Sequence, residues 1–296
     1  MTVDPALEAP RPSQGAGFSE AITCSFGDAA ADVFGVARLG LAAGGGASGL
    51  VMLFAGGAPV AVKAEGGVEV PEPVGSWDDV SAAGLDTEVV EPLRAWTLAF
   101  ASDDAAFDLR FEAAGEPAEL DASHPAAKAG GMTGYEQLCR VRGTATVAER
   151  RVKVDGLGQR GHSWGAPDWS KMTLARTVNA WLGPELGVTL TAVRPAKADA
   201  HGRELVAASL LEDGAVRDVA DPRLSTTYDG DGRQRHAGLE LWLEEDDDRA
   251  RRAAGEVLCG TTLDLGRLRL DCAFFRWHME GREGVGRYDV LRRAEG

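Results

Sequence analysis

Short apolar or alternating segments, separated by turn residues, run through this chain from residue 18 onward and constrain its fold more than any other feature. Alternation of apolar and polar side chains is the period of a strand with one buried face, and the gaps between segments carry Gly, Asp or Pro. The 38 glycines among 296 residues suit tight turns better than helices. We therefore predict an all-β fold of antiparallel strands with few helices. The expected strands are residues 18–26, 33–41, 50–54, 60–63, 89–101, 107–112, 135–147, 151–154, 172–181, 188–193, 204–211, 216–219, 239–243, 268–275 and 288–291.

The length of the chain indicates two folded units, although one large β-domain also fits 296 residues. Residues 1–17 are proline-rich and acidic, lack the apolar stretch of a signal peptide, and are expected to form a flexible leader. Residues 121–131 have too little periodicity for a regular element and are taken as the boundary. The expected units are residues 18–130 and residues 131–296. No sequence repeat links them, so any duplication would be one of structure.

The net charge of −15 argues against nucleic-acid partners and anionic membranes, because both surfaces repel an acidic protein. No apolar run is long enough for stable membrane insertion. Four widely spaced cysteines never form C-x-x-C and are expected to be buried thiols in a reducing compartment. We predict a cytoplasmic protein whose partner is a hydrophobic small molecule, with no nucleic-acid partner, no stable membrane insertion and an unknown oligomeric state.

Three motifs resemble cofactor or metal sites. Residues 44–49 and 156–161 spell G-x-G-x-x-G, but a dinucleotide site needs a helix after the last glycine, and neither run is followed by a helical pattern. Residues 229–232 resemble the start of a calcium loop, yet Arg233 and Gln234 stand where that loop needs an oxygen ligand and a glycine. A β-turn is the better interpretation of residues 229–232. We predict no cofactor and no metal.

The stretch from residue 152 to residue 169 is the richest in groups that titrate, donate hydrogen bonds or stack. Polar and aromatic side chains at a strand end, beside glycines, are typical of a site in the mouth of a barrel. A polar corner held by tryptophan packing and an Arg–Asp pair fits equally well. Its polar and aromatic members are Gln159, Arg160, His162, Ser163, Trp164, Asp168 and Trp169.

Residues 161–165 also fit G-x-S-x-G, the nucleophile elbow of an α/β-hydrolase. A serine hydrolase would use Ser163 with His201, His236 or His278 as the base. The parallel strand–turn–helix fold that this elbow requires is not predicted here, so this function is a remote alternative.

The central stretch, with Tyr135 and Glu136 upstream and residues 280–286 near the end, resembles the tandem lipocalin-like proteins that include carotenoid 1,2-hydratases (hydroxyneurosporene synthases) and AttH-like proteins. The usual pattern there is G-x-x-R-D-H-S-W-G-x-R-D-W. This chain departs from it at Gly161, where the family usually has Asp, and at Pro167, where it usually has Arg. The matching residues are Arg160, His162, Ser163, Trp164, Gly165, Asp168 and Trp169.

The resemblance implies two calycin-type β-barrels, residues 18–130 and 131–296, the second carrying the motif, with an apolar cavity. Its better-known members add water to an isoprenoid double bond by protonating it. Such chemistry needs an acid in a dry pocket and aromatic faces for the carbocation. We expect His162 and Asp168 to be catalytic. The expected substrate-binding residues are Tyr135, Gln159, Arg160, Trp164, Trp169 and Trp277.

Two hypotheses follow. The first is an enzyme that acts on a hydrophobic isoprenoid, polyene or steroid-like molecule by cofactor-free acid–base chemistry, through hydration, isomerisation or cyclisation. The second is a non-catalytic binding protein for such a ligand. The nearest partners by sequence are Arg160 for Asp168 and Gln159 for His162, and we expect at least three of the motif's side chains to meet at one pocket.

Overall fold

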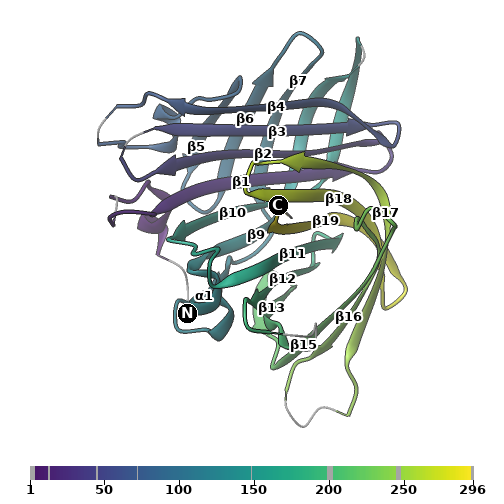
Figure 1. Ribbon diagram of the computed structural model, residues 1–296. Coiled ribbons are helices and arrows are strands. Elements are labelled where there is room, and N and C mark those ends of the chain that lie inside the picture. The colour runs from purple at the N-terminus through teal and green to yellow at the C-terminus, as the bar shows by residue number, and fades with distance from the viewer. Residues whose placement is uncertain are drawn as a thin grey trace. The chain divides into compact units, whose positions relative to one another are not determined.

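The computed structural model describes residues 4–12, 14–44, 46–71, 73–147, 149–198, 203–244 and 248–294, and in them the chain is mostly β-strand (Figure 1). The helical segments in these ranges are short: η1 (Pro5–Glu8), η2 (Trp77–Asp79) and α1 (Pro125–Gly130). The all-β fold predicted from the sequence is confirmed as two lipocalin-like antiparallel half-barrels. None of the described helices has the length and hydropathy that crossing a membrane requires.

The first sheet runs in the order β4-β3-β2-β1-β10-β9-β7-β6-β5, and β8 pairs with β9 off this path. Neighbouring strands are antiparallel throughout. Its strands are β1 (Ser19–Asp28), β2 (Val33–Ala42), β3 (Ala47–Ala55), β4 (Ala58–Val68), β5 (Leu85–Glu91), β6 (Ala95–Ala101), β7 (Ala105–Ala113), β8 (Ala118–Leu120), β9 (Met132–Val147) and β10 (Arg150–Gly165).

The second sheet repeats this connectivity in the order β14-β13-β12-β11-β19-β18-β17-β16-β15. In each sheet a four-strand meander comes first, and the last strand returns to pair with the first. The duplication is therefore one of structure, which the sequence does not display. Its strands are β11 (Met172–Gly183), β12 (Leu186–Pro195), β13 (Leu205–Glu212), β14 (Ala215–Asp218), β15 (Asp221–Tyr228), β16 (Gln234–Trp242), β17 (Arg251–Asp264), β18 (Leu268–Met279) and β19 (Arg282–Arg293).

Local sequence explains these strands and their turns. In β7 the side chains of Phe107, Leu109 and Phe111 are buried while those of the charged residues between them are exposed, as the alternation predicted. The two-residue turn between β3 and β4 is Gly56-Gly57, with φ values of 63° and 74°. Positive φ at both positions is the geometry of a type I′ hairpin turn, which matches the twist of the strands it joins.

Each sheet curls around a core of its own. Aromatic side chains such as Phe26, Trp77 and Trp96 fill the first core, and Phe275 and Trp277 lie in the second. The four cysteines are buried and form no disulfide, as expected.

The predicted boundary at residue 130 is wrong. β9 and β10 form the expected hairpin, but β9 pairs with β7 and β10 pairs with β1, so both strands complete the first sheet. The first compact unit therefore continues through Met132–Pro167, and the second consists of Leu120–Gly131 and the chain from Asp168 onward. The sequence predicted the hairpin but not its partners, of which β1 lies more than a hundred residues from β10 in the chain.

The flexible leader predicted at residues 1–17 is also not what the described part shows. Residues 4–8 form η1 behind an Asp4 cap, and the side chain of Glu8 is buried. We call residues 4–12 the N-terminal strap, because they pack on the first unit. The Glu8 carboxylate of the strap pairs with the buried Arg160 guanidinium, and this ion pair holds the strap on the first unit.

Candidate functional site

The central motif lies within one strand. β10 does not end near Gly156, as the sequence suggested, but continues to Gly165. Its side chains alternate, so Arg160, His162 and Trp164 share one face of the sheet. On the same face Glu20 of β1 pairs with Trp164, and Tyr135 of β9 pairs with His162. Four of the predicted site residues, Tyr135, Arg160, His162 and Trp164, are thus brought together.

His162 and Glu20 form a fully buried pair. The side-chain exposure of each is 0%, and Nε2 of His162 lies 2.7 Å from Oε1 of Glu20. The other ring nitrogen, Nδ1, lies 2.8 Å from the carbonyl oxygen of Leu7. The backbone N–H of Arg11 donates to both carboxyl oxygens of Glu20, at 3.1 and 2.9 Å.

These contacts determine where the protons lie. A carbonyl oxygen only accepts, so Nδ1 of His162 carries the hydrogen that is donated to Leu7. Nε2 and Glu20 then need one proton between them: a neutral imidazole beside a carboxylic acid, or an imidazolium beside a carboxylate. Burial lowers the pKa of His162, although the hydrogen bond to Glu20 opposes this, and so favours the neutral imidazole. The pair is a buried acid and base that share one proton.

Arg160 is enclosed and binds a carboxylate from the N-terminal strap. Its Nη2 pairs with Oε1 of Glu8, and its Nη1 donates to the Tyr135 hydroxyl at 2.9 Å. The backbone N–H of Leu93 donates to the second oxygen of Glu8 at 3.1 Å. The guanidinium carbon lies 4.6 Å from the ring centroid of Trp96. Burial lowers the pKa of Arg160 to about 9, so the group is still a cation at neutral pH and needs the opposite charge of Glu8.

Aromatic rings surround the imidazole of His162. The ring centroids of Trp77, Tyr135 and Trp164 lie 5.5, 5.7 and 5.1 Å from it, all in edge-to-face arrangements. Arg11 stacks its guanidinium on Trp164, 3.6 Å from the centroid. These rings keep water away from the acid and offer negative π-faces to a positive charge.

The N-terminal strap closes this site. Leu7 contributes a carbonyl to His162, Glu8 a carboxylate to Arg160, and Arg11 a backbone N–H to Glu20. The apolar side chain of Leu7 packs against a small cluster outside the main core. That cluster consists of Phe18, Leu93, Tyr135 and Trp164.

Gln159 does not partner His162, as we expected. It lies on the opposite face of β10 and donates to Glu136 at 3.0 Å, across from Gly161. A Cβ atom at Gly161 would collide with the carboxyl group of Glu136. Where the family pattern has an aspartate, this chain therefore keeps a glycine beneath a carboxylate that β9 supplies.

Asp168 is not the partner of Arg160. It accepts hydrogen bonds from the backbone and hydroxyl of Ser170, at 2.9 and 2.6 Å, and pairs with Lys171. These contacts lower the pKa of Asp168 to about 2, the hydrogen bonds of Ser170 contributing most. Asp168 is therefore ionised at neutral pH and poorly suited to donate a proton. Trp169 lies half-buried in the turn before β11.

Trp277 belongs to the core of the second unit, where it stacks on Phe275 with 5.7 Å between ring centroids. The alternation that placed Phe275, Trp277 and Met279 on one buried face is confirmed. Its predicted role in substrate binding stays a prediction.

The hydrolase interpretation loses its structural basis. Ser163 lies inside β10, paired with Ala21 and Gly134, and no strand-to-helix elbow surrounds it. Of its candidate bases, His236 and His278 lie on β16 and β18 of the second sheet, and His201 lies outside the described residues.

The second unit contains a similar Arg–Glu–Tyr cluster. Arg176 pairs with Glu204 and donates to the Tyr288 hydroxyl at 3.2 Å and to Thr226 at 2.9 Å. Glu204 also binds a second guanidinium, that of Arg194, at 2.9 Å.

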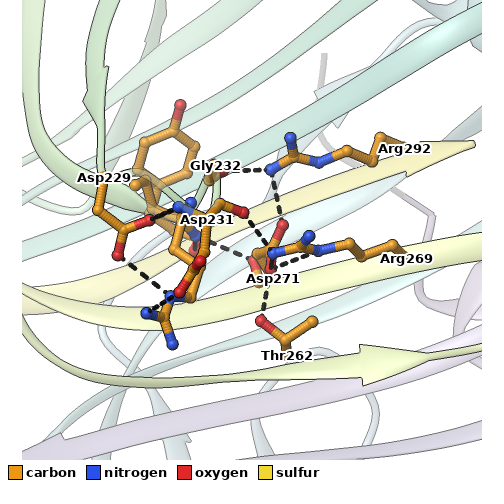
Figure 2. Close-up of polar contacts among 10 residues, drawn as sticks. Asp229, Asp231, Gly232, Thr262, Arg269, Asp271 and Arg292 are labelled. Atoms are coloured by element: carbon orange, nitrogen blue, oxygen red, sulfur yellow. Dashed lines mark hydrogen bonds and ion pairs between the residues drawn. The ribbon is translucent and has the colours of Figure 1, made fainter. Parts of the chain in front are cut away.

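Figure 2 shows a further buried carboxylate of the second unit, Asp271, clamped by Arg269 and Arg292. Asp271 accepts from Arg269 at 2.9 Å, from Arg292 at 2.6 Å and from the Thr262 hydroxyl at 2.6 Å. Both arginines also donate to backbone carbonyls of the turn at residues 229–233. The calcium-like sequence is thus a hairpin turn held to β18 and β19, as the β-turn interpretation predicted. No group of three metal-ligating side chains occurs within the described ranges.

Sequence reasoning missed Glu8, Arg11 and Glu20. Glu20 did leave a signal, because it stands between Phe18 and Ile22 on the apolar face of an expected strand, where an unpaired charge is costly. Glu8 left no comparable signal, since no periodic segment surrounds it.

Comparisons with known proteins support the fold. The family described as "Domain of unknown function (DUF7064)" matches residues 4–294. No curated protein matches the sequence. Kievitone hydratase from Nectria haematococca is a similar solved structure, with a TM-score of 0.66, 11% identity, and 98% of this chain and 93% of that chain covered.

Two other solved structures have the same fold. A putative AttH (NE1406) from Nitrosomonas europaea has a TM-score of 0.69 at 10% identity, with 94% of this chain and 93% of that chain covered. CghA has a TM-score of 0.65 at 14% identity, with 94% of this chain and 89% of that chain covered. At these identities the likeness concerns the fold alone.

Proposed function

Because the chain belongs to the DUF7064 family and has the fold of a hydratase, we propose that it is a cofactor-free acid–base enzyme for a hydrophobic small molecule of isoprenoid, polyene or steroid-like type. The reaction is a hydration, isomerisation or cyclisation that begins with protonation of a carbon–carbon double bond. Glu20 and His162 carry the proton, in place of the His162 and Asp168 pair suggested by the sequence.

One observation carries the proposal: a carboxyl group and an imidazole lie 2.7 Å apart, and neither side chain has exposed surface. Protonating an alkene needs an undissociated acid, and a carboxylic acid stays undissociated only where water does not stabilise its anion. The Glu20 side chain has no exposed surface, whereas the side chain of Asp168 is 45% exposed and its pKa is about 2.

The proton balance of a hydration follows from the pair. The Glu20 O–H gives its proton to one carbon of the double bond, whose π electrons form the new C–H bond and leave a cation at the other carbon. The faces of Trp77 and Trp164 stabilise that cation. A water molecule adds there and loses a proton to the Glu20–His162 pair, which restores the acid. These reaction steps involve no net change of oxidation state, so they require no oxidant or reductant.

The alternative is a non-catalytic binding protein, and the complete enclosure of the pair favours it, because a substrate reaches Glu20 only when the strap moves. We also propose a cytoplasmic location, which the free buried cysteines support.

Deuterium exchange into the ligand distinguishes the enzyme from the binding protein. The protein is incubated in deuterium oxide with a panel of isoprenoid, polyene and steroid alkenes. The masses of the recovered compounds are then measured by mass spectrometry. Reversible protonation by Glu20 should place deuterium on alkene carbons of at least one compound. Glu20→Gln should slow this by about 100-fold or more, while Asp168→Asn should leave the rate unchanged.

Loss of exchange in Asp168→Asn with full exchange in Glu20→Gln would overturn this assignment. Retention of a compound on the purified protein, without deuterium incorporation by any panel member, would favour the binding protein.

A further inference from the structure

Glu8 is held as a bound carboxylic acid would be held. One oxygen meets the Arg160 guanidinium, and the other accepts the backbone N–H of Leu93 at 3.1 Å and lies 3.5 Å from the Tyr135 hydroxyl. A cation, a peptide N–H and a phenol directed at two carboxylate oxygens form a complete recognition site. The chain fills this site with its own side chain.

The receptor side of this site is fixed independently of Glu8. Gln137 of β9 donates to the carbonyl of Leu93 at 3.1 Å and to that of Gly115 at 2.7 Å, which fixes the turn that presents the Leu93 N–H. Arg160 lies against Trp96. Removing Glu8 would therefore leave a preformed anion site.

The neighbour of Glu8 adds an apolar half. The side chain of Leu7 packs on the cluster of Phe18, Leu93, Tyr135 and Trp164. Together Leu7 and Glu8 present a branched hydrocarbon next to a carboxylate. An amphipathic acid with a hydrocarbon body beside its head group has the same two features.

The second unit provides an internal comparison. Glu204 binds two guanidinium groups, those of Arg176 and Arg194, and continues directly into β13. Glu8 binds one guanidinium and lies on a four-residue 3-10 turn. Of the two buried Glu–Arg pairs, Glu8 is the one that a competing carboxylate can displace.

We propose that Glu8 is an internal stand-in for a ligand carboxylate: the site on Arg160, Tyr135 and the Leu93 N–H takes an apolar carboxylic acid, which displaces the N-terminal strap. The head group replaces Glu8, and the hydrocarbon replaces Leu7 on the aromatic cluster. Resting on the proposed function, this narrows its substrate class to hydrophobic acids and brings the bound molecule beside His162, which stacks edge to face on Tyr135 and Trp164.

Octanoate serves as the probe and 1-octanol as its uncharged match, with binding to the full chain measured by calorimetry. In Glu8→Ala the strap no longer competes, so octanoate should bind about tenfold or more tightly than to the wild type. Glu8→Gln keeps the shape of the side chain but loses its charge, so its affinity for octanoate should fall between those of the wild type and Glu8→Ala. This variant also tests the proposal if Glu8→Ala does not fold. Octanol should not distinguish the three proteins.

Glu204→Ala is the matched control, since it removes the equivalent carboxylate of the second unit. It should leave octanoate affinity at the wild-type value. In the wild type, saturating octanoate should speed amide exchange in residues 6–11, because the strap is released.

Equal octanoate affinity in the wild type and both Glu8 variants, or slower exchange in the strap, would overturn the proposal. These readouts measure binding alone. A protein that binds octanoate in this way but never incorporates deuterium would keep the acid site and lose the proposed enzyme.

Discussion

Replacing Glu20 by glutamine tests where the shared proton lies. In the neutral pair, an amide N–H of the new side chain replaces the acid O–H as donor to Nε2 of His162. Its carbonyl oxygen still accepts from the backbone N–H of Arg11, which now contacts both carboxyl oxygens. We therefore expect Glu20→Gln to change the free energy of unfolding by no more than about 1 kcal/mol, the net value of one neutral hydrogen bond.

The charged alternative predicts a much larger loss. If His162 were an imidazolium, Glu20→Gln would remove the counter-charge of a cation whose side chain is fully enclosed. Breaking a buried ion pair in this way costs about 3–5 kcal/mol. Glu20→Leu is the control, because it removes the hydrogen-bond partner of Nε2 in either case; beside a neutral His162 this should cost about 1–3 kcal/mol.

Urea unfolding, followed by tryptophan fluorescence at about pH 8, measures all three proteins well above the ordinary pKa of histidine. The expected order of stability is wild type, then Glu20→Gln close behind, then Glu20→Leu. A loss of about 3 kcal/mol or more in Glu20→Gln would refute the neutral pair and with it the case for Glu20 as an undissociated acid.

Three more predictions follow from the same contacts. In Glu20→Gln, where His162 titrates without a carboxyl partner, burial still lowers the pKa of His162, so the unfolded variant takes up a proton first as the pH falls; its free energy of unfolding should decline below about pH 6.5, and urea midpoints between about pH 5 and 8 measure this. Gly161→Ala should cost less than about 1 kcal/mol in urea unfolding, because its methyl group meets only the movable carboxyl end of Glu136, whereas Gly286→Ala, whose methyl group would meet the backbone of Asn179 and Ala180, should cost about 1–3 kcal/mol or more. Asp271→Ala should cost about 2–3 kcal/mol and speed amide exchange in the β15–β16 turn, because it removes the anchor of both arginines (Figure 2).

The sequence predicted the fold because each strand and turn is determined by residues close together in the chain. Alternation over residues 107–112 and the glycine pair at residues 56–57 each specify their own element without reference to distant parts of the chain. The boundary between the units depends instead on which strands pair. β10 returns to β1 across most of the first unit, and no local pattern encodes that return.

The site was predicted in part for the same reason. Arg160, His162 and Trp164 stand two residues apart, so a continuous strand places them on one face. Their partners were chosen by nearness in sequence, and that choice failed at Asp168. In the structure the partners are Glu8 of the N-terminal strap and Glu20 of β1, which lie 152 and 142 residues from Arg160 and His162.

Enclosure and chemistry are linked through the N-terminal strap. The Leu7 carbonyl determines which nitrogen of His162 carries a hydrogen, and the Arg11 N–H binds the oxygens of Glu20. Lifting the strap removes both contacts and admits water, which competes with an alkene for the Glu20 proton. The acid is therefore competent only while something apolar covers it. A hydrophobic carboxylic acid that replaced Leu7 and Glu8 would restore that cover at the moment it delivered its own double bond, so that entry of the ligand and protection of the proton would be a single event.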